Sequence, residues 1–213
     1  MINLLKKIIL KNVNSSKNTN VLQTLGDLAQ TGHSFYRFSQ SVSGRSIESN
    51  FAEYIPGKIT EAKDNKKYLS FVTEKTIAMC FMYGDIITKL NFNLGDERFQ
   101  KIANVPVNYV GGVLEEYESK YLLVEQNYYL SDINTMEMLF GLVKDRNQLD
   151  VLFNMNYLGQ GTFLDKLNKY GFTESVKLLK YLQEEYEKEK NISPEDIRIK
   201  VREYKKSFCE TEN

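Results

Sequence analysis

The sequence predicts an α+β fold in which the N-terminal two-thirds mixes strands with helices and the C-terminal third is helical. Up to about residue 145, short aromatic or β-branched runs alternate with turn residues and short helical patterns. Beyond that point, apolar residues recur at intervals of three and four, which is typical of amphipathic helices. The chain has 213 residues, of which 42% are hydrophobic, so it can form a substantial core.

Short helices are expected around the first strand. Residues 1–10 carry apolar side chains on one face and include two lysines, so we interpret them as a docking helix, with membrane-surface attachment as the alternative. After a polar loop, residues 21–28 fit a short capped helix. The aromatic run at 34–39 predicts a strand, and residues 47–54 predict another short helix before a Pro-Gly break.

The central region is predicted to continue with a strand, a helix and a further strand. Residues 68–72 have strand character, and Thr73 is a good N-cap for a helix that runs to residue 82. A second strand is expected over 85–92. The acidic run at 115–118 is interpreted as a turn or strand entry that precedes an apolar strand at 121–124.

The C-terminal third is predicted to be helical. Stripes of apolar residues indicate helices over 163–170 and 173–190, and Ser193 followed by proline is a typical helix start. The change in composition divides the chain into an α+β part, residues 1–145, and a helical part, residues 146–213. Because the connecting segments are short, one continuous fold and two separable domains both fit.

Charge and composition narrow the classes of function. The 28 basic and 28 acidic residues balance, so there is no strong signal for nucleic-acid binding. Cys80 and Cys209 lie far apart and fit free thiols, and with a single histidine, His33, there is no zinc-site spacing. No metal is therefore predicted, although the sequence leaves a site made only of carboxylates open.

The cellular location of the protein is predicted from the lack of a recognisable membrane-spanning segment or secretion signal. No stretch approaches the length of a transmembrane segment, and no convincing secretion signal is present. We therefore expect a soluble protein that works in the cytoplasm or is delivered into a host cytoplasm. The sequence does not fix its oligomeric state.

Three segments carry candidate chemistry. Arg37 interrupts an otherwise apolar strand, and its planar charged fork suits phosphate binding, although an edge-strand arginine that faces water fits as well. Ser70 lies in a strand that leads directly into a helix, where a small hydroxyl can brace a cleft wall beside a planar ring. The acidic residues 115–118 can place a carboxylate at a sheet edge, or form a solvated turn.

In this order, the three segments resemble the three-part signature of the mono-ADP-ribosyltransferase family. That signature is an arginine on an early strand, a serine-containing strand that enters a helix, and a Glu-x-Glu or Gln-x-Glu motif before a late strand. Residues 36–37 (YR), 70–81 (SFVTEKTIAMCF) and 116–118 (EYE) resemble its parts. The resemblance covers about residues 33–135 and implies a split sheet.

The resemblance also implies a reaction and roles for five residues. The family uses NAD as co-substrate and transfers ADP-ribose to a macromolecule, here expected to be a protein. Arg37 and Tyr36 would hold NAD, and Ser70 would support the nicotinamide pocket. Glu118 would stabilise the positive charge that develops on the ribose, and Glu116 would assist the acceptor.

One departure from the family pattern leaves the role of the acidic motif open. The family's catalytic glutamate commonly comes just before the late strand, where this chain has Lys120. Either Glu118 is the catalytic residue in a shifted register, or Lys120 occupies the position and opposes the transition state. In the second case, the chain is a non-catalytic interaction protein whose helical C-terminus docks a partner.

Overall fold

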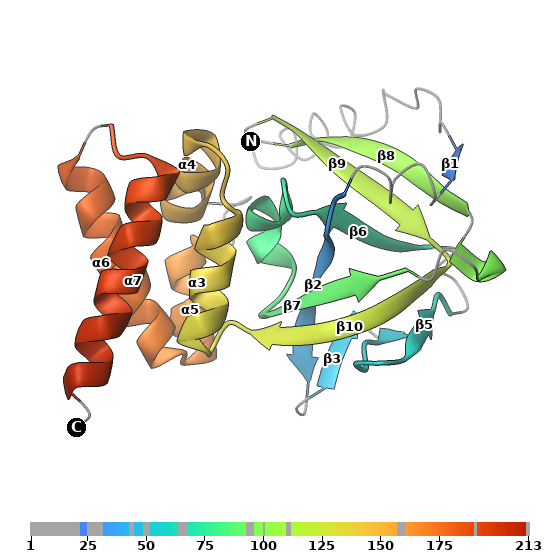
Figure 1. Ribbon diagram of the computed structural model, residues 1–213, viewed down its shortest axis with the longest axis horizontal. Helices are drawn as coiled ribbons and strands as arrows, with labels where there is room; N and C mark the ends of the chain where they lie inside the picture. The colour runs from blue at the N-terminus through green and yellow to red at the C-terminus, as the bar shows by residue number, and fades with distance from the viewer. Residues whose placement is uncertain are drawn as a thin grey trace, which may run out of the picture.

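A computed structural model describes residues 22–24, 32–42, 45–48, 52–63, 68–92, 96–99, 101–109, 112–156, 161–189 and 191–211, without the side chains of 22–24, 42, 45–48, 101–115 and 208–211. The β-sheet forms one half of the molecule, on the right in Figure 1, and the C-terminal helices form the other half, on the left. The prediction of an α+β fold with a helical C-terminus is therefore confirmed.

The sheet is antiparallel at every described strand pair. Two strands lie off its main path: β3 (Arg45–Glu48) pairs with β2 and with β4 (Ala52–Glu53). The main path, in spatial order, is β1 (Leu22–Thr24), β8 (Lys101–Tyr109), β9 (Gly112–Ser119), β6 (Leu69–Thr73), β2 (Phe35–Val42), β7 (Ile86–Asn91), β10 (Tyr121–Tyr129) and β5 (Ile59–Glu61).

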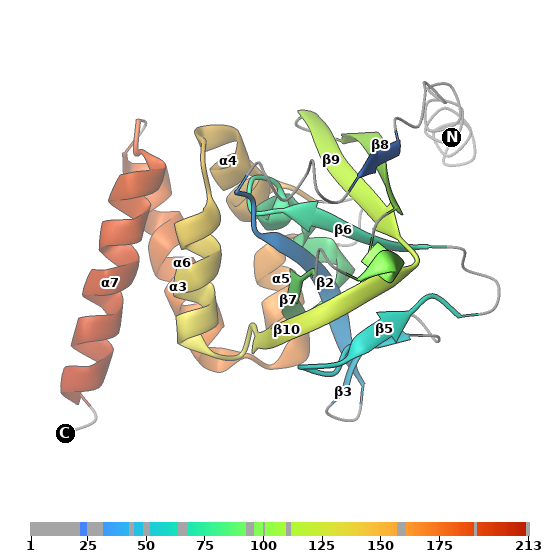
Figure 2. The same ribbon diagram turned by 45° about the vertical axis from the view of Figure 1, so that its right-hand side comes forward.

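The sheet is split between β6 and β2. These strands pair at only two positions, Phe35 with Thr73 and Tyr36 with Val72, and then part. Beyond that short ladder, β6 continues against β9, while β2 continues against β7. From the turn that joins them, β9 and β10 accordingly run apart into the two halves (Figures 1 and 2).

A clamp of side-chain and backbone bonds closes the short ladder at its end. The Glu74 carboxylate contacts Nδ1 of His33 at 2.6 Å and accepts the backbone N–H of Ser34 at 2.9 Å. The backbone N–H of Glu74 donates in turn to the Ser34 carbonyl at 3.0 Å. The one histidine of the chain thus helps to join the two halves of the sheet.

Two apolar cores lie on the two faces of the sheet because strand side chains alternate between faces. The helix-side core receives Tyr36, Phe38, Val72 and Ile87 from the sheet and packs them against the helices. The sheet-side core consists of Phe35, Ala52, Tyr54, Ala62, Leu69, Phe71, Leu90, Phe99, Tyr117, Leu122 and Val124. Its rings pack edge-on and stacked, as Phe35 and Tyr117 do against Phe71.

Between the sheet and the helices lies a short 3₁₀ helix, η1 (Ile77–Tyr83), whose residues 77–81 are all buried. Another 3₁₀ turn, η2 (Glu97–Phe99), buries Phe99 in the sheet-side core. The helices that cover the helix-side core are α3 (Ile133–Leu142), α4 (Arg146–Asn154), α5 (Phe163–Tyr170), α6 (Thr173–Lys188) and α7 (Pro194–Thr211).

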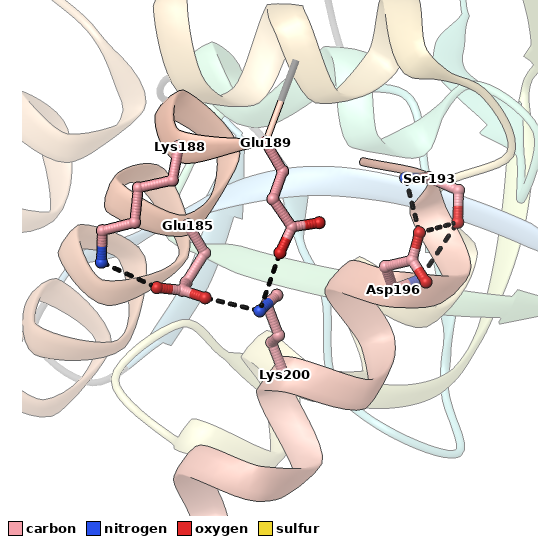
Figure 3. A network of polar contacts seen from close by, with 6 residues as sticks. All are labelled: Glu185, Lys188, Glu189, Ser193, Asp196 and Lys200. Carbon is pink, nitrogen blue, oxygen red and sulfur yellow. Dashed lines mark hydrogen bonds and ion pairs between the residues drawn. The ribbon is translucent and has the colours of Figure 1, made fainter. Parts of the chain in front are cut away.

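Polar contacts join α6 to α7 near the loop between them (Figure 3). Glu185 pairs with Lys188 on its own helix, as their spacing predicts, and with Lys200 on α7. The Ser193 hydroxyl accepts the backbone N–H of Asp196 at 3.2 Å, which confirms the predicted start of the last helix. The described helices include none that is long and apolar enough to cross a membrane.

Several sequence predictions were wrong. Residues 22–24 form a strand instead of a helix, and 45–48 and 52–53 form strands where a helix over 47–54 was expected. The helix expected to start after Thr73 is the 3₁₀ helix η1, which begins at Ile77. Strand β8 and helix α3 were not predicted. The predicted docking helix, residues 1–10, lies outside the described residues.

Candidate functional site

Arg37 lies where the two halves of the sheet part. Its guanidinium donates from Nη1 to the Ser70 carbonyl on β6 at 3.0 Å, and thus spans the gap beyond the last β2–β6 pair. The Tyr54 ring lies against the guanidinium, with Cζ 4.4 Å from the ring centroid. Arg37 is only 7% exposed, so it is not the water-facing edge arginine that was one expectation.

Ser70 and the acidic motif lie on the next two strands. Ser70 on β6 is directly opposite Glu118 on β9, and Val72 is opposite Glu116. Both glutamates are half-buried, so the expectation of a solvated turn at 115–118 is corrected: the motif lies within a strand. Arg37, Ser70 and Glu118 therefore occupy three adjacent strands, β2, β6 and β9.

The side chains of these residues do not all leave the sheet on the same face. Phe71 and Tyr117 belong to the sheet-side core, so Ser70, Glu116 and Glu118 project toward the helix side. Arg37 alternates with Tyr36 and starts from the opposite face, and its guanidinium reaches between the strands.

Cys80 on η1 is a buried thiol whose pKa responds to both Arg37 and Glu116. Its thiol is buried and donates to the Thr76 carbonyl at 3.7 Å. Burial raises the pKa of Cys80 above its ordinary value, the nearby charge of Glu116 raises it further, and Arg37 lowers it. Burial therefore keeps Cys80 as a neutral, unreactive thiol.

Tyr36 is placed differently from its expected role. It is 6% exposed and packs in the helix-side core, opposite Val72. Burial raises the pKa of its phenol, while a hydrogen bond with the Ser34 side chain lowers it. Tyr36 shares a face with Ser70 and Glu116, but its ring is part of the packing between sheet and helices.

Lys120, the residue at the family's usual glutamate position, lies outside the candidate site. It forms the exposed turn between β9 and β10, and its ammonium is 3.1 Å from Glu61 on β5. The hydrogen bond from Lys120 lowers the pKa of the Glu61 carboxyl. The positive charge of Lys120 is therefore directed to the β5 edge of the sheet.

Sequence reasoning missed a set of polar residues on β7 and β10, on the side of β2 that faces away from β6. Arg37 is directly opposite Thr88 on β7, and Thr88 is directly opposite Asn127 on β10. The Thr88 hydroxyl donates to Oδ1 of Asn127 at 2.7 Å and contacts the Ser39 hydroxyl at 3.2 Å. Asn127 donates from Nδ2 to the Tyr54 carbonyl at 2.8 Å. A threonine on the same face of the strand as Ile86 and Leu90 was the available signal.

The candidate site shows no metal-binding geometry within the described part of the chain, where no group of three or more His, Cys, Asp or Glu residues could hold an ion. Comparison of the chain with protein-family models, with curated proteins and with solved structures found no match. The geometry of the site and the resemblance of its motifs are therefore the basis for any function.

Proposed function

We propose that this protein is an NAD-dependent mono-ADP-ribosyltransferase that modifies a macromolecule, with a protein as the expected acceptor. One observation carries the proposal. Three motifs that are far apart in the sequence contribute Arg37, Ser70 and Glu118 to three adjacent strands, where Arg37 bonds to Ser70 and Ser70 faces Glu118. The sheet parts beside them, as the resemblance implies.

The residue types suit the chemistry of this transfer. Arg37 carries a permanent positive charge that complements the NAD pyrophosphate. Glu118 would stabilise the oxocarbenium character of the ribose while the bond to nicotinamide breaks and its electron pair leaves with the nicotinamide. The acceptor nucleophile would then bond to the same ribose carbon and give its proton to Glu116. Ser70 would brace the nicotinamide beside Glu118.

The test is transfer of labelled ADP-ribose from NAD to proteins of a cell lysate, together with release of nicotinamide. Glu118→Gln keeps the shape of the side chain and should lower both rates at least about a hundredfold, the usual cost of a lost transition-state contact. Glu116→Gln should lower transfer more than NAD hydrolysis. Glu61→Gln is the matched control, because it changes an exposed carboxylate on β5, away from β2, β6 and β9, and should leave both rates unchanged.

A second candidate, a non-catalytic interaction protein, is favoured by the burial of Arg37. The guanidinium is covered by Tyr54 and bonded to a backbone carbonyl, which suffices as a structural role. In that case the wild-type protein would neither bind NAD nor hydrolyse it. The absence of NAD binding in calorimetry at millimolar NAD would exclude the transferase and favour this second function.

A further inference from the structure

A row of polar residues crosses the sheet-side face of one half of the sheet. Arg37, Thr88 and Asn127 occupy directly opposite positions on the neighbouring strands β2, β7 and β10. The residues two positions away on the same strands share this face and belong to the sheet-side core, such as Phe35 on β2 and Leu90 on β7. Polar side chains here are thus an interruption of an apolar face.

The row is closed into a circuit by Tyr54. Thr88 donates to Asn127, and Asn127 donates to the backbone carbonyl of Tyr54. The ring of the same Tyr54 lies on the Arg37 guanidinium. Thr88 is fully buried, Tyr54 is 1% exposed and Asn127 is half-buried, so Thr88 and Tyr54 hold Asn127 from two sides.

The circuit and the Ser70 carbonyl both act on the Arg37 guanidinium. The Ser70 carbonyl holds Nη1, and the Tyr54 ring fixes the plane of the guanidinium. The Tyr54 ring is packed in the sheet-side core, and Asn127 donates to the carbonyl of the same residue and so anchors its backbone. The bonds of Asn127 go to Thr88 and Tyr54, so Asn127 acts on Arg37 through Tyr54.

We infer that Asn127 is a positioning residue that, through Tyr54, fixes the Arg37 guanidinium in the orientation in which it receives the NAD pyrophosphate. This inference rests on the proposed function for the ligand. The orientation of Arg37 is a property of the protein alone and is tested separately. Thr88 supports Asn127, since its hydroxyl donates to the amide oxygen and leaves the amide nitrogen directed at Tyr54.

The test compares Asn127→Leu, which keeps the side-chain size and removes both hydrogen bonds, with Ser175→Ala. Ser175 is a buried residue whose hydroxyl also donates to a backbone carbonyl, that of Leu130, but on the helical side of the molecule. The control therefore removes the same kind of bond outside the circuit. Thr88→Val is the second variant if Asn127→Leu does not fold.

Two readouts are needed. The first is ¹⁵N side-chain NMR of the guanidinium, with the Arg37 signals assigned by their loss in Arg37→Lys. In wild type and in Ser175→Ala, the Arg37 Nη signals should be separate because rotation is hindered, and in Asn127→Leu they should merge. The second is the Kd for NAD, which should rise about tenfold in Asn127→Leu and stay unchanged in Ser175→Ala.

Each outcome decides a distinct point. Separate Arg37 signals in Asn127→Leu, or an NAD affinity equal to that of Ser175→Ala in a wild type that binds NAD, would overturn the inference. If wild type does not bind NAD, the proposed function fails, and with it the ligand assigned to Arg37. Merged signals in Asn127→Leu would still establish Asn127 as the residue that orients Arg37.

Discussion

Replacing Gly84 by alanine should destabilise the protein strongly for a reason that is purely steric. Gly84 follows η1, and its φ of 179° is extended backbone that any residue adopts. An added Cβ, however, would lie 1.8 Å from the Ser39 carbonyl oxygen and 2.3 Å from its carbonyl carbon. Both are backbone atoms of β2, so no side-chain rotation can relieve the overlap.

The size of the effect follows from what has to move. An ordinary contact of a Cβ begins at about 3.4 Å, so the strand or η1 must shift by more than 1 Å. Such a shift would strain the hydrogen bond from the Asp85 N–H to the Ser39 carbonyl, 3.0 Å long. Overpacking of this kind costs about 3 kcal/mol, at the upper end of the usual range. For a chain of this size, that lowers Tm by about 6 to 12 °C.

The assay is thermal and urea unfolding followed by circular dichroism, with Gly141→Ala as the matched control. Gly141 lies within α3, is exposed, and has nothing within 4 Å of an added Cβ. Alanine there should stabilise the protein by about 0.5 to 1 kcal/mol, because glycine is a poor helix residue. A Gly84→Ala protein within about 0.5 kcal/mol of wild type would refute the close approach of η1 and β2.

Two further predictions concern pH. Burial lowers the pKa of Lys166 from 10.5 to about 8, so the unfolded chain binds this proton more tightly than the folded protein does. The free energy of unfolding of wild type should therefore rise relative to that of Lys166→Met as pH increases from about 8 to 10.5. Urea-unfolding measurements that show the same pH dependence for both proteins would contradict this. Burial raises the pKa of Glu74, but hydrogen bonds involving His33, Ser34 and the backbone outweigh it and bring the pKa below 4.5. This stabilisation is present above the pKa of Glu74 in the unfolded chain and is lost as pH falls through its pKa in the folded protein. The difference in unfolding free energy between wild type and Glu74→Gln should therefore become smaller in acid. A difference that stays constant with pH would exclude the contacts of Glu74 with His33 and Ser34.

The elements that sequence predicted well are those with a local signal. Strands β2, β6, β7 and β10 have runs of aromatic and β-branched residues, and α6 has an apolar stripe over several turns. In contrast, β3 and β4 are short and exist because they pair with β2 and with each other. The apolar spacing within residues 47–54 fitted a helix, and tertiary pairing overrode it.

The candidate site was predictable as a set of motifs but not as an arrangement. Arg37, Ser70 and Glu118 stand out in sequence by their contexts, yet their proximity depends on the order β9–β6–β2, which joins strands distant in the chain. Thr88 and Asn127 carried little signal, since polar residues that alternate along a strand ordinarily face water. Here Thr88 is fully buried and Asn127 half-buried, so these polar side chains bond to each other and to Tyr54.

The split of the sheet determines which substitution can separate the two proposed functions. Where β6 parts from β2, the Ser70 carbonyl loses the ladder partner that a continuous sheet would provide, and Arg37 takes that place. Arg37 therefore has a structural task whether or not NAD binds. Removing it leaves a partly buried carbonyl without this partner, at a cost of up to about 1 to 3 kcal/mol. Loss of activity in Arg37→Ala would then follow under either function. Glu118→Gln keeps the strand and the size of the side chain, removes the charge, and replaces one acceptor oxygen by an NH2 donor. Its effect on NAD cleavage, at unchanged stability, is the result that distinguishes a catalytic carboxylate from a residue that merely holds two strands together.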